Sequence, residues 1–586
     1  MLAGSFCFRC GACTNFIVTP GASADGSLMV SYAADSHTLY GELYFREAAD
    51  WKEGEMRKVF DWDTGRYLCE IPQAAHTYKR VGNMNEHQMI ITETTFGGRP
   101  ELVDRYGGLD YGSLIHIALE RCRSAREAIT LIAELVEQEG YYSEGETFTI
   151  ADSGEVWIME IIGKGVVMKN GRNLNKGAVW VAVKVPDGYV CCHANQSRIT
   201  TFPLQDSANC MYSKDVISFA RKMGYYSGPD DEFSFADAYC PLDFSGMRAC
   251  EARVWSAFNI ASGGWFRFED NTGRMVTKDA YSFIDHASGL NAANRLPLWI
   301  QPEKKLTVKD VADIMRDHFE GTPFDMTGDI GAGGNALPYR FRPLTYEVDG
   351  KKYVNERAIA TQQTGFWMVG QVRPKMPDVI GGVLWFGTDD TATSYLTPLY
   401  TNITKVPECF REGNGDLMTY SPTSSFWINN RVANACYKMY NQMAPFVRKE
   451  VDDFENGQLK AINEVEDKAI DEFQKIAMRE LEKAAKKGYR YNPMTDTGDT
   501  FASVKKILTN YSVSTAQKQF DKWVELETVL LVKFLDGNVK KQNRDGSFVH
   551  SEFSKRMPAD PDFPGYTDTW KEHVAGSTGE HLQVRK

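Results

Sequence analysis

One cysteine near the amino terminus has the surroundings of a nucleophile. Cys13 follows the small pair Gly11-Ala12 and opens an apolar stretch, CTNFIVT, that predicts a strand over residues 13–19. If the bond before Cys13 is cut, the residue gains a free α-amine with an ordinary pKa of about 7.7–8.0, which can take the thiol proton at neutral pH. One residue then supplies both nucleophile and base. The competing interpretation is a buried structural cysteine.

The same cysteine also ends a metal-like pattern. Cys7, Cys10 and Cys13 have the spacing of an iron–sulfur run, but the next cysteine is Cys69, too distant to complete it. A zinc site would need a second ligand pair, for which the only candidate is residues 191–193, Cys-Cys-His. We therefore expect no metal and no organic cofactor, and we interpret Cys7 and Cys10 as parts of a leader.

Three further motifs have a functional and an ordinary interpretation. His193 could act as the base of a Cys–His pair, although a structural histidine is the more common case. Residues 328–334 are glycine-rich but lack the Gly-Lys-Ser/Thr ending of a phosphate loop. Asp389 and Asp390 have no neighbouring carboxylate or histidine cluster that would indicate a metal. We expect none of these motifs to carry the chemistry.

Composition limits the classes of partner. The 586 residues include 66 lysines and arginines against 78 aspartates and glutamates, which gives a formal charge of −12. This balance argues against nucleic acid and anionic membrane surfaces, since both require clustered positive charge. The sequence has no run of 18 apolar residues, so we expect no membrane span. With 43% hydrophobic residues, the chain has ample material for a folded core.

The first 200 residues mix strands with helices. Apolar and alternating runs predict strands over residues 28–32, 88–96 and 178–185, and a hairpin over 147–162 that turns at Asp152-Ser153-Gly154. Residues 113–138 have helical periodicity, with Ser124 and Glu127 in capping-box spacing. This order predicts layers of strands and helices rather than a simple βαβ repeat.

The last third changes to helical periodicity. Apolar residues recur every three to four positions over 459–481 and again over 520–534, which predicts two long amphipathic helices. We therefore divide the chain into a leader or pro-peptide of residues 1–12 that is removed, a mixed domain over 13–424, a helical region over 425–540 packed on it, and a polar, loosely ordered tail over 541–586.

Several long motifs, in order, resemble the dipeptidase A family. This family is a cysteine branch of the N-terminal-nucleophile hydrolases, related to secernins and more distantly to bile salt hydrolases and penicillin V acylases. The resemblance runs from Cys13 to about residue 440. The motifs are CTNFIVTPGASADGSLMVSYAADSH (13–37), DWDTGRYLCEIPQAAHTYKRVGNMNEHQMIITETTFGGR (61–99), YYSEGETFTIADSGEVWIMEIIGKG (141–165), HANQSRI (193–199), SKDVISFAR (213–221), CEARVWSAFN (250–259) and TQQTGFWMVGQVRP (361–374).

The resemblance implies an α+β fold, an αββα sandwich with the nucleophile at the end of a central strand. It also implies roles for four residues. Cys13 matches the nucleophile, and Asp35 matches the aspartate that orients its α-amine. Asn195 matches the side-chain donor to the oxyanion, and Arg253 matches an arginine that lowers the thiol pKa or binds a substrate carboxylate. Thr95 stands where bile salt hydrolases have an asparagine, as a second oxyanion contributor.

The expected activity is hydrolysis of dipeptides through a thioester on Cys13. Two alternatives remain open: an acylase of the penicillin V or bile-salt type, and a secernin-like interaction protein without activity. Dipeptides are the expected partners, and a homo-oligomer is left open. The route by which residues 1–12 are removed is also left open. So is the compartment, which is cytoplasmic if the chain starts as printed and periplasmic or secreted if the leader is longer.

Overall fold

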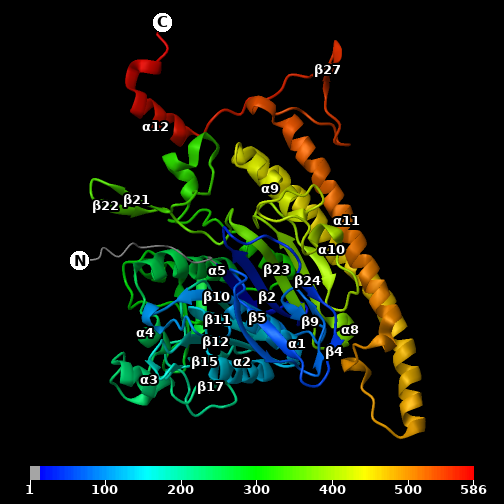
Figure 1. Ribbon diagram of the computed structural model, residues 1–586. Coiled ribbons are helices and arrows are strands. Elements are labelled where there is room, and N and C mark those ends of the chain that lie inside the picture. Colours follow the sequence, from blue (N-terminus) through cyan, green and yellow to red (C-terminus); the bar gives the residue numbers. More distant parts are fainter. Residues whose placement is uncertain (1–12, 586) are drawn as a thin grey trace.

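The computed structural model describes residues 13–585, so the expected leader, with Cys7 and Cys10, lies outside the described residues. The expected nucleophile precedes β1, an inner strand of an antiparallel seven-stranded sheet whose strands β2, β23 and β24 are labelled in Figure 1. In sheet order, the strands are β20 (Trp299–Ile300), β16 (Val190–His193), β1 (Thr14–Val18), β2 (Leu28–Asp35), β23 (Thr364–Val372), β24 (Val383–Thr388) and β25 (Thr397–Tyr400).

A second antiparallel sheet packs against the first, with contacts from β10 to β1 and β2. Its strands are, in order, β17 (Cys210–Tyr212), β15 (Ala178–Lys184), β12 (Val156–Gly163), β11 (Gly145–Ala151), β10 (Ile90–Gly97), β9 (Met84–Asn85), β8 (Arg80–Val81) and β3 (Phe45–Arg46). The hairpin predicted over residues 147–162 is confirmed as β11 and β12, joined by residues 152–155.

Period-two alternation gives this second sheet two buried faces. In β12, Trp157 and Met159 belong to the core beneath helices α1 (Tyr111–Arg121) and α2 (Ala125–Glu139). The intervening Ile158 belongs to the core that includes the first sheet. Alternate side chains of a strand point to opposite faces, so the helices lie on one face and the other sheet on the opposite face.

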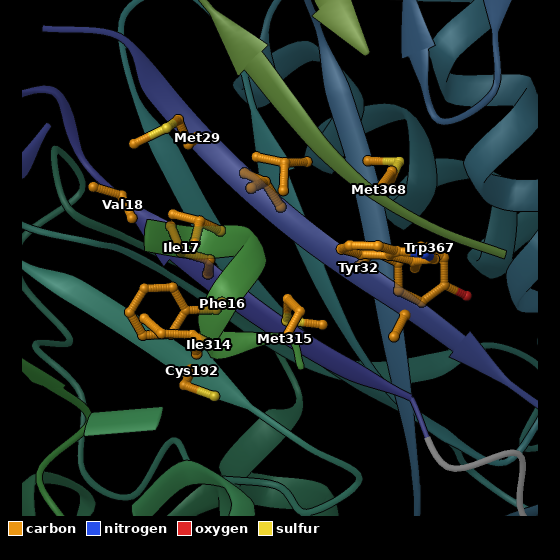
Figure 2. Packing of buried hydrophobic residues seen from close by; sticks show 14 of the residues in the cluster. Phe16, Ile17, Val18, Met29, Tyr32, Cys192, Ile314, Met315, Trp367 and Met368 are labelled. Carbon is orange, nitrogen blue, oxygen red and sulfur yellow. The ribbon is translucent and has the colours of Figure 1, made fainter. Parts of the chain in front are cut away.

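Helices also cover the outer face of the first sheet. Helices α5 (Ala252–Ser262) and α7 (Val308–Ile314) contact β16 and β2, respectively. Figure 2 shows Ile314 and Met315, at the end of α7, beside Phe16 of β1. Helices α9 (Ser425–Cys436), α10 (Tyr440–Lys487) and α11 (Ala502–Lys533) pack on β24 and β25. The chain is therefore an α+β protein whose two packed sheets carry helices on both outer faces.

The remaining elements are short or peripheral. No helix in residues 13–585 is both long and apolar enough to cross a bilayer. The region beyond residue 540 contains a short hairpin and one exposed helix, which extend from the body in Figure 1. The smaller strands form two-stranded sheets: β4–β7 (Ala49–Asp50, His76–Thr77), β5–β6 (Met56–Phe60, Tyr67–Pro72), β13–β14 (Met168–Lys169, Arg172–Asn173), β18–β19 (Trp265–Glu269, Met275–Asp279), β21–β22 (Thr345–Val348, Lys351–Val354) and β26–β27 (His550–Ser551, Ser554–Pro558). The smaller helices are α3 (Val216–Met223), α4 (Phe235–Tyr239), α6 (Ile284–Ala287), α8 (Asp378–Gly381) and α12 (Asp568–Thr578).

Candidate active site

Cys13 lies between the two sheets, at the start of β1. The strand's alternation directs Thr14 toward α5 on the outer face and Asn15 toward β10 of the other sheet, where Asn15 Nδ2 donates to the carbonyl oxygen of Glu93. Cys13 shares the inner face with Asn15. Its Sγ lies 3.4 Å from Glu93 Oε1 and 4.0 Å from the Tyr32 hydroxyl oxygen. The tyrosine hydroxyl in turn donates to the same Glu93 oxygen.

The surroundings of Cys13 favour the thiol over the thiolate. Burial raises the pKa of Cys13 well above its ordinary value, and the negative charge of Glu93 raises it further. The backbone N–H of Asp35 acts in the opposite direction. A base is therefore needed before this sulfur can attack a carbonyl carbon.

A second carboxyl lies behind Glu93. Glu146 of β11 is fully buried and accepts a hydrogen bond from Thr95 Oγ1 at 3.0 Å. Burial, followed by the charge of Glu93, raises the pKa of Glu146 well above its ordinary value. Two adjacent buried carboxylates repel each other, and this repulsion favours the protonated form of Glu146.

Asp35 ends β2, beside Cys13 on the neighbouring strand. The register of β1 and β2 pairs Thr14 with Ala33. On its other side, β2 pairs with β23, and this pairing has a register shift between Ala34 and Asp35. The carboxylate is fully buried and bonds Arg357 Nη2 at 2.5 Å and Thr364 Oγ1 at 2.7 Å. Burial raises the pKa of Asp35, and the positive charge of Arg357 opposes this rise.

Asn195 follows β16 in a left-handed backbone conformation, with φ of 63°. Its Nδ2 donates to the carbonyl oxygen of Thr95 at 2.7 Å, and its Oδ1 accepts from Arg253 Nη2 at 2.9 Å. The side-chain amide is therefore held at both ends. Thr95 contacts Asn195 through its backbone and Glu146 through its hydroxyl.

Arg253, on α5, holds three segments together. Its Nη1 donates to Cys13 O at 2.7 Å and Thr14 Oγ1 at 2.9 Å. Its Nη2 donates to Ala194 O at 3.0 Å and to Asn195 Oδ1, and its Nε donates to Ala249 O at 2.8 Å. A guanidinium has five N–H groups, and these bonds use all of them. This arrangement favours positioning of Cys13 and Asn195 over a bidentate bond to a substrate carboxylate.

A cavity of about 710 Å³ opens beside Cys13. Its volume is in the range of small-molecule sites. Six carboxylates line it, and Arg105 is the one lining residue with a formal positive charge. The lining His116 adds no positive charge, because burial lowers its pKa well below its ordinary value and favours the neutral imidazole. The carboxylates are Asp35, Glu42, Asp61, Asp63, Glu93 and Glu144.

A second cavity, of about 270 Å³, has mostly basic residues among the charged groups of its wall, with Arg248 paired to Glu356 and Arg357 paired to Asp35. Asn195 lines it together with four arginines, and Asp243 is the one acidic residue in its wall. Thr95 lines both cavities, and the Asp35–Arg357 ion pair joins their walls. The arginines are Arg248, Arg253, Arg342 and Arg357.

His193 is buried and engaged at both ring nitrogens. Thr94 Oγ1 lies 2.7 Å from its Nδ1, and Thr149 Oγ1 lies 2.7 Å from its Nε2. Burial lowers the pKa of His193 to about 3. The imidazole is therefore a neutral bridge between strands, as the structural interpretation of the sequence expected.

The structure brings Cys13, Asp35, Asn195 and Arg253 into one site, as the resemblance implied for their positions. Sequence reasoning missed Glu93, Glu146 and Arg357. Two of these are single carboxylates inside otherwise apolar or threonine-rich strands, β10 and β11. A charged side chain in a strand with two buried faces needs a partner. A single glutamate within each of these strands was therefore the sequence signal that could have indicated a functional site.

Comparison with known proteins finds one family and several related chains. A model of peptidase family C69 matches residues 49–453, more than half of the chain. A "Probable dipeptidase" of Salmonella dublin is 25% identical over 415 residues, covering 66% of this chain and 81% of that protein. A "Probable dipeptidase B" of Lactococcus lactis subsp. lactis (strain IL1403) is 24% identical over 439 residues, covering 72% and 81%. A "Probable dipeptidase B" of Streptococcus pyogenes serotype M1 is 22% identical over 522 residues, covering 85% and 92%.

These matches define a peptide-bond hydrolase. The chain belongs to peptidase family C69, the dipeptidase A family. The family resemblance predicted from the sequence motifs is thus confirmed.

Proposed function

We propose that the chain is a cysteine-type dipeptidase of the N-terminal-nucleophile class, with Cys13 as its nucleophile. The observation that carries this proposal is the position of Cys13, at the head of β1 and in the wall of the larger cavity. The two packed sheets with helices on both outer faces support the αββα sandwich of that class. The names of the similar proteins support dipeptides as substrates.

The reaction begins once the bond between residues 12 and 13 is cut. The freed α-amine of Cys13 accepts the thiol proton, and the sulfur attacks the carbonyl carbon of the substrate. The side-chain amide of Asn195 stabilises the oxyanion, an interaction worth about 3–4 kcal/mol in other acyl-transfer enzymes. The carbon–nitrogen bond breaks, the leaving amino acid takes the proton from the ammonium, and a thioester remains. Water, deprotonated by the same amine, then hydrolyses the thioester.

Arg253 and Asp35 have supporting roles in this proposal. Arg253 fixes the carbonyl group of Cys13 and the amide of Asn195 relative to each other. Asp35, next to Cys13 on the neighbouring strand, orients the freed α-amine while Arg357 balances its charge. Residues of this cluster provide the proposed acid–base chemistry without a cofactor.

The test combines intact mass with turnover of a simple dipeptide. We expect active wild-type protein to begin at Cys13, and Cys13→Ala to lose turnover because it lacks the sulfur. Self-cleavage would also leave Cys13→Ala uncut, whereas cutting by another peptidase would not. Cys13→Ser is the matched control for size. Full activity in protein that retains residues 1–12 would contradict the amino-terminal mechanism. Hydrolysis of other amides but not of dipeptides would favour an acylase. If no small amide is hydrolysed, a non-enzymatic role would be favoured.

A further inference from the structure

The position of a substrate's α-amine is restricted by covalent geometry. In a dipeptide, the α-nitrogen lies about 2.5 Å from the carbon of the scissile carbonyl, since two bonds separate them. The attacking sulfur must approach that carbon to about 3–3.5 Å. The α-nitrogen therefore lies within about 6 Å of Cys13 Sγ. Glu93 is the carboxylate in direct contact with this sulfur, with Oε1 at 3.4 Å.

Glu93 has the capacity to accept further donors. Its side chain is 1% exposed and lines the larger cavity. Apart from the contact between the two carboxyl groups, its Oε2 and the neighbouring Glu146 Oε1 are buried oxygens to which no group among the described residues donates. Such oxygens destabilise the folded protein unless a ligand or a proton satisfies them. An ammonium group brings three donors and a positive charge to these buried acceptor oxygens.

The two cavities add an independent argument, because their charges are opposite. The cavity on the Cys13 side has six carboxylates and one arginine in its wall. The cavity on the Asn195 side has four arginines and one aspartate. They meet at Thr95, which lines the larger cavity together with Cys13 and accepts a hydrogen bond from the amide of Asn195. A dipeptide zwitterion has the same polarity, positive at one end and negative at the other.

We propose that Glu93 binds the α-ammonium group of the substrate, and that the basic cavity across Thr95 receives the carboxylate of the leaving amino acid. This inference rests on the proposed dipeptidase function and adds the orientation of the substrate and two specificity determinants. The amino-terminal residue stays in the acidic cavity as the thioester. The carboxy-terminal residue departs through the basic cavity, whose volume of about 270 Å³ suits one amino acid rather than a long peptide.

The ammonium site is tested with two substrates that differ by one amino group, alanyl-alanine and propionyl-alanine. We expect wild-type kcat/KM to favour alanyl-alanine by at least about 100-fold, because a buried carboxylate is left unpaired by the analogue. Glu93→Gln should reduce this ratio at least about tenfold, whereas Glu93→Asp should keep most of it. The ratio is the readout, since a general loss of activity would change both rates equally. Glu408→Gln, an exposed carboxylate outside both cavities, is the matched control.

The carboxylate site is tested with alanyl-alanine against its carboxy-terminal amide. Arg342 is the residue to change, since Arg253 and Arg357 hold Cys13 and Asp35. Its Nε donates to the neutral Gln363 at 2.7 Å. We expect Arg342→Gln to raise KM for alanyl-alanine at least about fivefold and to leave KM for the amide nearly unchanged. The exposed Arg411→Gln is the control.

The outcomes separate the orientation from the activity itself. Equal rates on alanyl-alanine and propionyl-alanine in the wild type would overturn the ammonium site and leave an amide hydrolase. An unchanged substrate ratio in folded Glu93→Gln would do the same. Equal effects of Arg342→Gln on the dipeptide and its amide would overturn the carboxylate site. If wild-type protein that begins at Cys13 hydrolyses none of these compounds, the proposed function fails instead.

Discussion

The imidazole of His193 lies on β16, the strand next to the proposed nucleophile, where its register partner is Asn15 of β1. A histidine this close to a cysteine invites comparison with Cys–His hydrolases. The contacts argue against a role as base, because Thr94 and Thr149 engage both ring nitrogens. A neutral imidazole with one donor and one acceptor matches two hydroxyl groups, which makes the ring a bridge within the core.

We therefore predict that His193→Gln retains most activity. The glutamine amide also offers one donor group and one acceptor, so it can bond both threonines, and kcat on a dipeptide should stay within about threefold of wild type. The pH–rate profile should keep its shape, because the pKa of His193, about 3, lies below the range in which the profile is measured. His193→Leu is the comparison for packing without hydrogen bonds. A loss of 100-fold or more in kcat for a folded His193→Gln would restore histidine as the base.

At the residue scale, the sequence was informative where chemistry depends on local context. The small pair before Cys13 and the apolar strand after it are neighbours in the chain, and the motifs around Asp35, Asn195 and Arg253 are continuous. Glu93 and Glu146 could not be paired from sequence. They lie on adjacent strands, and only the register of β10 and β11, which places Glu146 opposite Thr95, brings the two carboxyl groups close enough for Glu93 to raise the pKa of Glu146.

At the scale of elements, the helical pair α1 and α2 shows how one residue sets a boundary. The periodicity predicted helix from 113 to 138, and the structure has two helices separated at residues 122–124. Ser124 is the N-cap of α2, with its side chain accepting from the backbone N–H of Glu127. Glu127 Oε2 accepts from the backbone N–H of Arg123. The capping signal was therefore correct, and it marks the start of a second helix.

We predict that Ser124→Ala weakens the first turn of α2. Loss of an N-cap hydroxyl costs about 1 kcal/mol, which corresponds to about a fivefold change in an opening equilibrium. Hydrogen exchange should therefore show about a fivefold loss of protection for the amides of the first turn. Ser514→Ala, at an exposed position within α11, is the matched control. Unchanged protection in the first turn of α2 would show that packing alone holds that end.

Element length explains which predictions reached the correct bounds. The apolar runs of β1, β10 and β15 are confirmed within one or two residues. Helix α10 extends from residue 440 to 487, well beyond the predicted 459–481, because Pro445 and the buried Glu455 interrupt the apolar pattern of its early part. Two-residue strands such as β20 have no periodicity to detect, and only their partner strands define them.

At the scale of the whole molecule, buried charge joins the helical region to the mixed domain. Arg316 after α7 and Glu455 of α10 form an ion pair at 2.5 Å, and Arg373 after β23 pairs with Glu466 of α10 at 2.5 Å. Asp389, directly after β24, accepts from Asn430 of α9 at 3.0 Å. The boundary we drew at residue 425 therefore crosses a well-packed interface of the structure.

Asp389 gives this interface a pH dependence. Burial raises its pKa from an ordinary value of about 3.9 to about 8. The folded state therefore binds a proton more tightly than the unfolded chain, and this contribution to stability is full below about pH 3.9 and is lost as pH rises through 8. Asn at this position tolerates the left-handed φ of 66° and can keep the bond to Asn430.

We predict that Asp389→Asn raises the midpoint of thermal unfolding more at pH 8.5 than at pH 5. The substitution removes a carboxyl that is held in its protonated form in the folded state. The free energy needed to keep it protonated grows from pH 5 to pH 8, so its removal stabilises the fold more at the higher pH. Thermal scans at both pH values measure the difference. The exposed Asp453→Asn should show no such dependence beyond its lost helix pair with Lys449. Equal shifts at both pH values would mean that the side chain is charged in the folded protein.

The saturated guanidinium of Arg253 has a consequence for a newly made chain. Its acceptors come from the strand that starts after Cys13, the turn at Asn195 and its own helix, regions that are up to 240 residues apart in the chain. Until all three have docked, nucleophile and amide have no common anchor. If the proposed mechanism holds, a nascent or partly opened molecule lacks an assembled site and should not hydrolyse dipeptides until it has finished folding.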